Sequence, residues 1–423
     1  MKNPLSPFAL SPAEILLPAP GVDPGAWAVV ACDQYSAQPE YWRKADETVG
    51  DAPSTLRLIY PEAFLESDAE AGIDRAPAIH EAMRRYLAEG VLHRAVSGMV
   101  YVERQTGATP RRRGLVAALD LECYAYEKTS PPPMIRPTEG TIAERIPPRV
   151  RIRRDAPLEL PHILVLYDDP ADALMSALTQ TAQSGSLRPL YDTQLMLGGG
   201  RVRGWAVERE GDMAHIAKAL GTLDTNFLFA VGDGNHSLAT AKACWEERKS
   251  RLSPEQAACH PARYALCELI NLHDEGLAFH PIHRVLFGVD APAVEAALGA
   301  WCSARGAAPV SSGGVTLCRT LHANGSGAWR VDAVREGLPL ALLQAFLDDY
   351  LRATPSARID YVHGDADAAA LGQKPGNMAL LLDLLDKSAL FPYVAAHGAL
   401  PRKAFSMGEA DEKRYYMEAR AIL

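Results

Sequence analysis

The stretch NFLFAVGDGNHSLATAK, residues 226–242, joins three kinds of sequence in one short span. Its apolar first part is typical of a buried strand, its last part is typical of a helix, and a polar turn with two glycines lies between them. The first N–H groups of a helix have no intrahelical partner, and the helix dipole adds roughly half a positive charge at that end. The stretch therefore predicts an anion-binding turn, with phosphate as the usual anion.

The polar side chains of this turn offer specific chemistry. Asp233 can hold Mg²⁺ or act as a base, and His236 can act as a general acid or base or clamp a phosphoryl oxygen. Glycine tolerates positive φ and lets a ligand approach the backbone, so a phosphate would contact Gly232, Gly234, Asn235 and Ser237. A purely structural role explains the same residues equally well, because DGN is a common turn and Asn or Ser caps helices.

The rest of the chain alternates short strands with helices. This alternation predicts an α/β fold, with α+β as the alternative, built on mixed sheets with a smaller C-terminal lobe. We expect a main domain over residues 1–289 and a lobe over residues 290–423. Strands are expected at 27–32 and 55–60, a long hairpin at 98–126 with a solvated triple-arginine tip at 111–113, and an ordered proline-rich loop at 130–154.

Composition excludes several classes of protein. The formal charge of -9 and the pI of about 5.8 disfavour nucleic acid as a partner, because such a surface repels phosphate backbones. The seven cysteines are scattered, which is typical of reduced thiols rather than of a disulfide framework. No apolar run approaches the roughly 20 residues of a membrane span, and no signal peptide is evident. We expect a cytoplasmic protein that does not enter the membrane.

Five sequence motifs together resemble one known family. They are CDQY (32–35), TEGTIAERIPPRVRIRRDAPLELPHILVL (138–166), GDGNHSLATAK (232–242), PIHR (281–284) and LPRKAFSMGEADEKRYY (400–416). As a set they resemble the bacterial and archaeal family called domain of unknown function 1015. Many members carry DGHHR at the polar turn, a signature similar to one in the ParB/sulfiredoxin-like fold, which includes a free serine kinase that uses ADP. The resemblance implies a ParB/sulfiredoxin-like strand–turn–helix element and chemistry on serine or phosphoserine, with ADP or ATP and Mg²⁺ as cofactors.

This chain departs from that signature at two positions. Asp233, Gly234 and His236 match it, but Asn235 replaces a histidine and Ser237 replaces an arginine. One cationic phosphate contact is therefore missing. Lys242, just over a turn later, is positioned to compensate.

Other charged clusters are candidates for binding the substrate. Phosphoryl transfer depends on cations around the moving group, and the proline-rich segment supplies arginines on what we expect to be a rigid loop. Solvated surface arginines are the alternative there, and a basic strand edge is the alternative near the C-terminus. The candidates are Arg136, Arg145, Arg149, Arg151, Arg153 and Arg154 with Glu139 and Thr141, then His283 and Arg284, and finally Arg402, Lys403 and Ser406. Asp33 either joins the same cleft or forms an Asx-type turn.

The motif HDEGLAFHPIHR (273–284) raises zinc or iron binding as an alternative, because its His, Asp and Glu residues are typical metal ligands. No GxSxG, HExxH or Cys–His motif for nucleophilic catalysis is evident. The sequence thus predicts a phosphoryl-transfer enzyme acting on a small metabolite, best on free serine or phosphoserine, in the kinase or phosphatase direction. The alternatives are a non-catalytic nucleotide or metabolite sensor and, with less support, a ParB-like DNA-binding protein.

Overall fold

The computed structural model describes residues 3–141, 146–335 and 337–423. These residues form two compact units. The first contains the chain up to residue 137 together with 141–278 and 408–423, and the second contains 138–140 and 279–407. Both combine helices with mixed or antiparallel sheets, so the predicted α/β class is confirmed.

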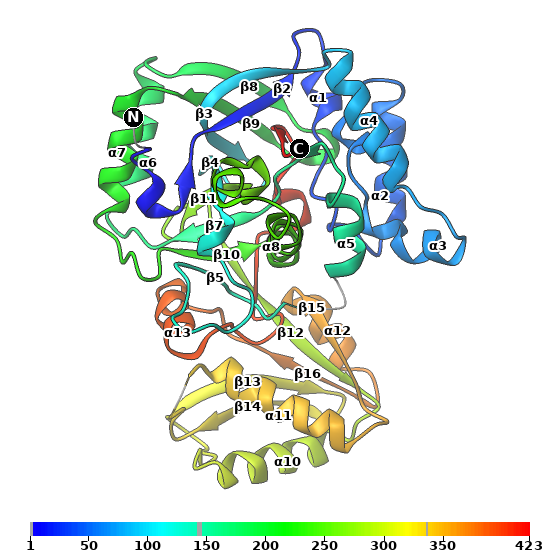
Figure 1. Ribbon diagram of the computed structural model, residues 1–423. Coiled ribbons are helices and arrows are strands. Elements are labelled where there is room, and N and C mark those ends of the chain that lie inside the picture. The colour runs from blue at the N-terminus through cyan, green and yellow to red at the C-terminus, as the bar shows by residue number, and fades with distance from the viewer. Residues whose placement is uncertain (1–2, 142–145, 336) are drawn as a thin grey trace. The chain divides into compact units, whose positions relative to one another are not determined.

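A ten-stranded sheet forms the centre of the first unit (Figure 1). Its main path runs β5-β10-β7-β11-β4-β3-β9-β8, with β1 and β2 paired to β4 and β3, and β18 pairs with β6 in a separate ribbon. The strands are β1 (Leu10–Ser11), β2 (Ala13–Pro18), β3 (Leu92–Gln105), β4 (Arg112–Asp120), β5 (Ile135–Pro137), β6 (Leu158–Glu159), β7 (Leu164–Tyr167), β8 (Arg188–Gln194), β9 (Arg201–Val207), β10 (Phe229–Asp233), β11 (Tyr264–Asn271) and β18 (Arg420–Ala421).

Each face of this sheet packs on its own hydrophobic core. Successive side chains of a strand point to opposite faces, so Val100 and Val102 of β3 belong to one core while Met99 and Tyr101 belong to the other. Helices α2 and α4 cover the first face, and α6, α7 and α8 cover the second. The helices are α1 (Pro24–Trp27), α2 (Pro39–Val49), α3 (Leu65–Glu70), α4 (Ala76–Ala88), α5 (Ile146–Arg153), α6 (Ala173–Gln183), α7 (Glu210–Leu220), α8 (Asn235–Lys249) and α9 (Pro254–Cys259).

The second unit is built on a six-stranded antiparallel sheet. Its strand order is β14-β13-β16-β12-β15, with β17 paired to β12. The strands are β12 (Phe279–Phe287), β13 (Val315–His322), β14 (Gly325–Val331), β15 (Arg358–His363), β16 (Asn377–Leu381) and β17 (Phe405–Met407), and the helices are α10 (Ala291–Ala304), α11 (Pro339–Ala353), α12 (Asp365–Gly372) and α13 (Leu390–His397).

The division between the units differs from the boundary expected between residues 289 and 290. Strand β12 lies before that boundary but pairs with β15 and β16, which places it in the second sheet. Residues 408–423 lie after it but return to the first unit, where β18 pairs with β6. Strand pairing between segments distant in sequence decides both assignments.

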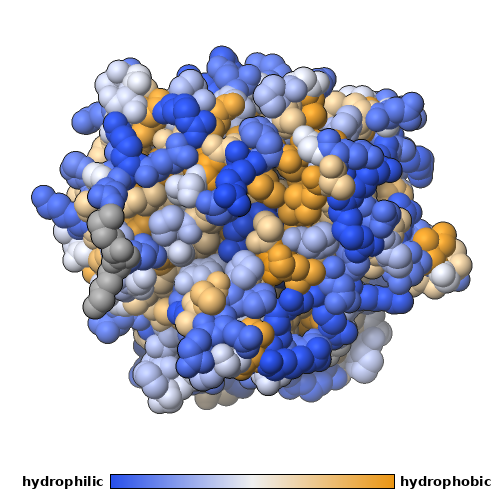
Figure 2. Space-filling model, turned by 45° about the horizontal axis from the view of Figure 1, so that its top comes forward, coloured by the Kyte–Doolittle hydropathy of each residue, from blue (hydrophilic) through white to orange (hydrophobic). Residues whose placement is uncertain are grey.

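The face of the molecule in Figure 2 is predominantly hydrophilic. Figure 2 shows small apolar patches scattered among polar side chains on one face. Among the described residues, the exposed large hydrophobic side chains are Ile73, Leu87, Leu384 and Leu423. No helix in the described part of the chain has both the length and the apolar character needed to cross a membrane.

Two expected strands near the N-terminus are wrong. Residues 28–31 are buried, but they pair with the C-terminal segment through Ala31 and Arg414 and through Val29 and Tyr416 rather than joining the large sheet. Residues 55–57 form a 3-10 turn, because the Ser54 hydroxyl accepts the backbone N–H of Leu56. Apolar composition alone does not distinguish a sheet strand from these segments.

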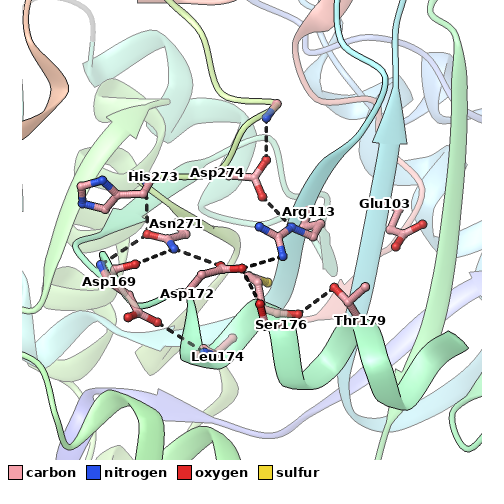
Figure 3. Close-up of polar contacts among 12 residues, drawn as sticks. Glu103, Arg113, Asp169, Asp172, Leu174, Ser176, Thr179, Asn271, His273 and Asp274 are labelled. Carbon is pink, nitrogen blue, oxygen red and sulfur yellow. Dashed lines mark hydrogen bonds and ion pairs between the residues drawn. The ribbon is translucent and has the colours of Figure 1, made fainter. Parts of the chain in front are cut away.

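The triple arginine is largely buried, not solvated. Arg112 and Arg113 belong to β4 and are 5% and 8% exposed. The Arg113 guanidinium lies 2.8 Å from both Asp172 and Asp274, and Figure 3 shows it pointing toward the two carboxylates. Carboxylates that follow neighbouring strands compensate the buried charge, which local sequence does not reveal.

The proline-rich segment is not entirely a loop. It contributes β5 to the large sheet and then helix α5, whose second and third residues are Pro147 and Pro148. Proline fits the first turn of a helix because the missing N–H has no intrahelical partner there. Arg145 lies outside the described residues.

Candidate functional site

The polar turn adopts the predicted strand–turn–helix geometry. Strand β10 ends at Asp233, Gly234 follows with φ of 77°, and α8 begins at Asn235. A Cβ on residue 234 would lie 3.0 Å from the Cα of Ile163, beside which the turn passes. Glycine is therefore required here both by the left-handed backbone and by the close approach.

Lys413 lies at this helix start. Its ammonium is 3.0 Å from Oδ2 of Asp233, whose Oδ1 accepts the Gly234 N–H at 2.9 Å. Lys413 is 8% exposed and comes from the C-terminal segment that returns to the first unit. A buried cation thus lies beside the partly positive end of α8, and a single described carboxylate pairs with it.

A hydrogen-bonded chain of side chains begins at the other end of the turn. Ser237 Oγ lies 2.8 Å from Nε2 of His162, and Nδ1 of the same imidazole lies 2.8 Å from the Tyr416 hydroxyl. The Tyr416 oxygen also accepts the backbone N–H of Cys32 at 3.1 Å. Three segments distant in sequence therefore meet around one histidine.

Asp33 adds an ionised carboxylate to this cluster. Burial alone would raise its pKa, but the charge on His162, the Gln34 amide and the cations Lys413 and Arg149 outweigh burial and lower the pKa of Asp33. The carboxylate therefore stays charged at neutral pH. That Asp33 shares a cleft with the polar turn stays a prediction, because Asp33 is not among the residues that line the cavity described below.

A cavity of about 140 Å³ opens beside the hydrogen-bonded chain. Its polar lining includes Ser237, His162 and Tyr416. The two arginines that line it, Arg149 and Arg153, are ion-paired with Glu62 and Glu159. The remaining lining is mostly apolar, from Leu58, Ile59, Leu65, Met83, Pro148, Ile152, Leu158, Leu160, Ile163 and Leu266.

A family model matches residues 14–324 of the chain, described as protein of unknown function (DUF1015). The chain belongs to this family. The match includes CDQY, His162 and the polar turn, whereas Lys413 and Tyr416 lie beyond its C-terminal limit.

Solved structures similar to this family member are distant. A mutant free serine kinase in complex with ADP is 8% identical with a TM-score of 0.39, covering 72% of this chain and 91% of that one. A conserved hypothetical protein from Pyrococcus furiosus is 12% identical (TM-score 0.35; 72% and 90% covered). SbnI from Staphylococcus aureus, truncated at its C-terminus, is 8% identical (TM-score 0.37; 71% and 85% covered). No curated protein matches the chain.

The structure brings together some of the predicted residues of the first unit and not others. Arg149 lines the cavity, whereas Lys242 donates to the Leu121 carbonyl at 2.9 Å and pairs with Glu246. Arg136 donates to the carbonyls of Pro133 and Asn226 at the opposite end of β10. The substitution of Ser237 for arginine is therefore not compensated by Lys242.

Two further predicted residues have buried atoms with no partner among the described residues. These are Oδ1 of Asn235, the first residue of α8, and Oγ1 of Thr141. His236 is half-buried, and its carbonyl accepts the Thr240 hydroxyl at 2.7 Å.

The other predicted residues belong to the second unit. The Arg284 guanidinium is fully buried and donates to the carbonyls of Ile282 and Arg402 and to the Gln344 amide oxygen. Burial lowers the pKa of Arg284 to about 10. Arg402 bonds to the Tyr361 hydroxyl at 2.8 Å and pairs with Asp348 at 2.6 Å.

The remaining predicted residues of the second unit are described by their hydrogen bonds, their strand pairing or their backbone conformation. The buried His283 accepts the Leu382 N–H at Nδ1, so its Nε2 donates to Asp365 at 3.0 Å. Glu139 bridges to Leu400, Ser406 lies on β17 opposite His280, and Lys403 has φ of 57°. Glu139 and Ser406 are thus engaged within the fold of the second unit, whereas Lys403 is exposed.

The zinc or iron alternative is wrong for the described residues, where no three His, Cys, Asp or Glu side chains form a metal-binding group. The candidate ligands have other partners. His273 bonds to Asp168 at 2.7 Å, Asp274 pairs with Arg113, and His283 bonds to Asp365.

Sequence reasoning missed three residues of the candidate site. His162, Lys413 and Tyr416 all lie inside quoted family motifs, at 138–166 and 400–416. For His162 a signal existed, since it just precedes a strand that pairs antiparallel with β10. For the other two, nothing local indicated that residues 408–423 return to the first unit.

Proposed function

We propose that the chain transfers a phosphoryl group to or from a small metabolite at the amino end of α8, with serine or phosphoserine as the best candidate. The observation that carries the proposal is the Lys413–Asp233 pair at the polar turn. A helix start, a buried ammonium and a glycine turn supply the dipoles and charge that phosphoryl transfer needs.

Each residue of the turn has a role in this proposal. The phosphate would contact Lys413 and the first-turn N–H groups of α8, which Gly234 exposes. Asp233 would accept the proton of the attacking hydroxyl, and His236 would steady the transferring group. Lys413 takes the place of the cation that the sequence expected from Lys242.

The residues present also fit a magnesium ion brought in with a phosphorylated ligand. Mg²⁺ is usually held by one or two carboxylates together with substrate phosphates rather than by a complete protein cage. Asp233 and Asp33, both near Lys413, would supply those carboxylates. Bound there, the ion would neutralise phosphate charge. ADP or ATP is the proposed phosphoryl acceptor or donor.

Phosphorus NMR tests the proposal directly. Purified protein is mixed with O-phosphoserine and Mg²⁺, with and without ADP. Inorganic phosphate formed without nucleotide identifies a phosphatase, and ATP formed from ADP identifies a reversible serine kinase. If the phosphoserine signal neither shifts, broadens nor decays, the serine assignment is wrong.

Matched variants then test the site. Lys413→Met and Asp233→Asn should lower turnover at least about 100-fold, the scale of losing an electrostatic contact to a transferring group. Lys249→Met is the control, because Lys249 lies on the same helix, at its far end, and pairs with Glu122 at 2.7 Å. Equal activity in Lys413→Met and Lys249→Met would contradict the site assignment.

A non-catalytic ligand sensor is the second candidate, and the cavity favours it. An apolar cavity of about 150 Å³ accepts a benzene-sized group, so this cavity could accept a planar part of a larger ligand whose phosphates lie at the turn. Binding of ADP without turnover of any phosphorylated metabolite would support the sensor. DNA binding has little support on a chain with a formal charge of -9.

A further inference from the structure

The Ser237–His162 pair has the geometry of a nucleophile and its base. The Oγ–Nε2 distance is 2.8 Å, within the roughly 2.6–3.2 Å that such a pair requires. A third group, the Tyr416 hydroxyl, orients the imidazole through Nδ1 at 2.8 Å. The residues of the pair are 75 positions apart, which is why no local motif indicated it.

The surrounding hydrogen bonds are compatible with the tautomer that a base needs. Among the described residues the Ser237 hydroxyl has one side-chain partner, so donating to Nε2 of His162 uses its hydrogen. Nδ1 then carries the imidazole proton and donates to the Tyr416 oxygen. That oxygen also accepts the Cys32 backbone N–H at 3.1 Å. Burial raises the pKa of Tyr416, so its hydroxyl stays protonated.

The groups at the two ends of the hydrogen-bonded side chains supply the electrostatics that acyl transfer needs. Ser237 lies in the first turn of α8, where backbone N–H groups without intrahelical partners can donate hydrogen bonds to a developing oxyanion. The charge on His162 is among the causes that lower the pKa of Asp33, so the ionised carboxylate lies within electrostatic reach of the imidazole. It would stabilise the imidazolium that forms when His162 takes the serine proton.

The cavity beside Ser237 indicates the class of electrophile. Its arginines are neutralised by Glu62 and Glu159, and most of the remaining lining is apolar. Such a cavity suits an uncharged group about the size of benzene rather than a phosphate. The cation proposed to contact phosphate, Lys413, does not line this cavity and lies instead beside Asp233.

We propose that Ser237 is a catalytic nucleophile, with His162 as its general base, toward small uncharged carboxylic esters whose acyl group enters this cavity. This activity goes beyond the proposed phosphoryl transfer and does not depend on it. Tyr416 and Asp33 act as positioning residues, through His162.

The reaction proceeds in two balanced steps. Ser237 Oγ forms a bond to the ester carbonyl carbon while its proton passes to Nε2 of His162. The carbon–oxygen bond to the alcohol then breaks, and His162 gives the proton to the departing oxygen, which leaves an acyl-serine and a free alcohol. Water repeats the sequence on the acyl-serine, and a carboxylic acid and the free Ser237 hydroxyl result.

Covalent labelling of the full-length protein tests the nucleophile. The protein is incubated with a biotin-tagged fluorophosphonate, digested and analysed by mass spectrometry. We expect one adduct per chain on the peptide that contains Ser237. Absence of label on Ser237, or label confined to another residue, overturns the proposal, and this result requires no variant to fold.

Variants test the base and the positioning role. His162→Gln should slow labelling about 100-fold or more, the usual scale for loss of a general base, and Ser237→Ala should abolish it. The controls are Ser250→Ala, just past the other end of α8, and His215→Gln, on the exposed face of α7, which should label like the parent protein. Labelling of His162→Gln at the parent rate overturns the proposal.

Turnover of p-nitrophenyl butyrate provides an independent kinetic readout. We expect a burst of one nitrophenolate per chain followed by slower steady-state release, the signature of an acyl-enzyme. Tyr416→Phe should lower kcat while leaving KM unchanged, because phenylalanine keeps the ring that lines the cavity and loses only the hydroxyl that bonds to the imidazole. Hydrolysis without a burst that persists in Ser237→Ala would contradict the assignment.

Discussion

Replacing Gly234 with alanine should damage both stability and the candidate site. The backbone there has φ of 77°, and an L-residue in that region costs about 1–2 kcal/mol. The new Cβ would lie 3.0 Å from the Cα of Ile163, whereas carbon atoms pack at about 3.5–4.0 Å. The turn and Ile163 must therefore separate by about 0.5 Å, which adds an overpacking cost of about 1–3 kcal/mol.

The same displacement should break the Ser237–His162 hydrogen bond. Ile163 directly follows His162, and Gly234 precedes Ser237 by less than one helical turn. A bond of 2.8 Å lengthened by about 0.5 Å exceeds the roughly 3.2 Å that proton transfer from a nucleophile to its base tolerates. The fluorophosphonate reaction at Ser237 should therefore slow in the Gly234→Ala variant.

Gly185→Ala is the matched control for this prediction. Gly185 has φ of 73°, but a Cβ at residue 185 would meet nothing within 4 Å. Both variants have the free-energy cost of an L-residue at positive φ. Urea denaturation followed by circular dichroism gives the midpoint of each variant, and the difference between the midpoints reports the cost of the contact with Ile163. If the two variants unfold at the same urea concentration and react equally at Ser237, the close-approach argument is refuted.

Three further predictions concern charged residues. Arg113→Met leaves two carboxylates without their buried cation and should cost about 3–5 kcal/mol of unfolding free energy. Arg201→Met removes one partner of an exposed pair and should leave the urea denaturation midpoint nearly unchanged. Hydrogen bonding to Arg75 lowers the pKa of Asp68, so this pair stabilises the fold above about pH 4 and loses that contribution as the pH falls through the folded-state pKa. Arg75→Met should therefore flatten the acid limb of the melting temperature against pH, and an unchanged limb would contradict the assignment. Lys242→Met should leave the phosphorus NMR response to O-phosphoserine intact, because the Lys242 ammonium bonds to the Leu121 carbonyl; a lost response would restore its predicted role.

Local pattern predicted much of the first unit correctly. The hairpin of β3 and β4, the strand β10 and the helix α8 follow from alternating or helical spacing of apolar residues. The polar turn followed from two glycines between a strand and a helix. These features depend on residues that are neighbours in the sequence, so the local pattern is enough to predict them.

The errors in charged residues share a physical cause, which is pairing between distant segments. Arg113 was expected in solvent because arginine usually is, but carboxylates from two other segments neutralise it in the interior. Lys242 was chosen as the phosphate cation because it lies on the same helix as the turn. Lys413, far along the chain, is the cation that the structure brings to Asp233.

The C-terminal segment determines whether the candidate site exists at all. Arg414, between Lys413 and Tyr416, is buried and ion-paired with Glu268 of β11 and with Glu418. Breaking a buried pair leaves an uncompensated charge and costs about 3–5 kcal/mol, so these contacts hold the segment firmly on the sheet. The backbone of Arg414 and Tyr416 also pairs with Ala31 and Val29. Cys32 and Asp33 directly follow this paired segment. A cation, a tyrosine and a carboxylate from the two ends of the chain are thus fixed on one rigid support, where the polar turn and His162 meet them. Residues placed with this precision by buried ion pairs, rather than by a mobile loop, are what both proposed reactions require.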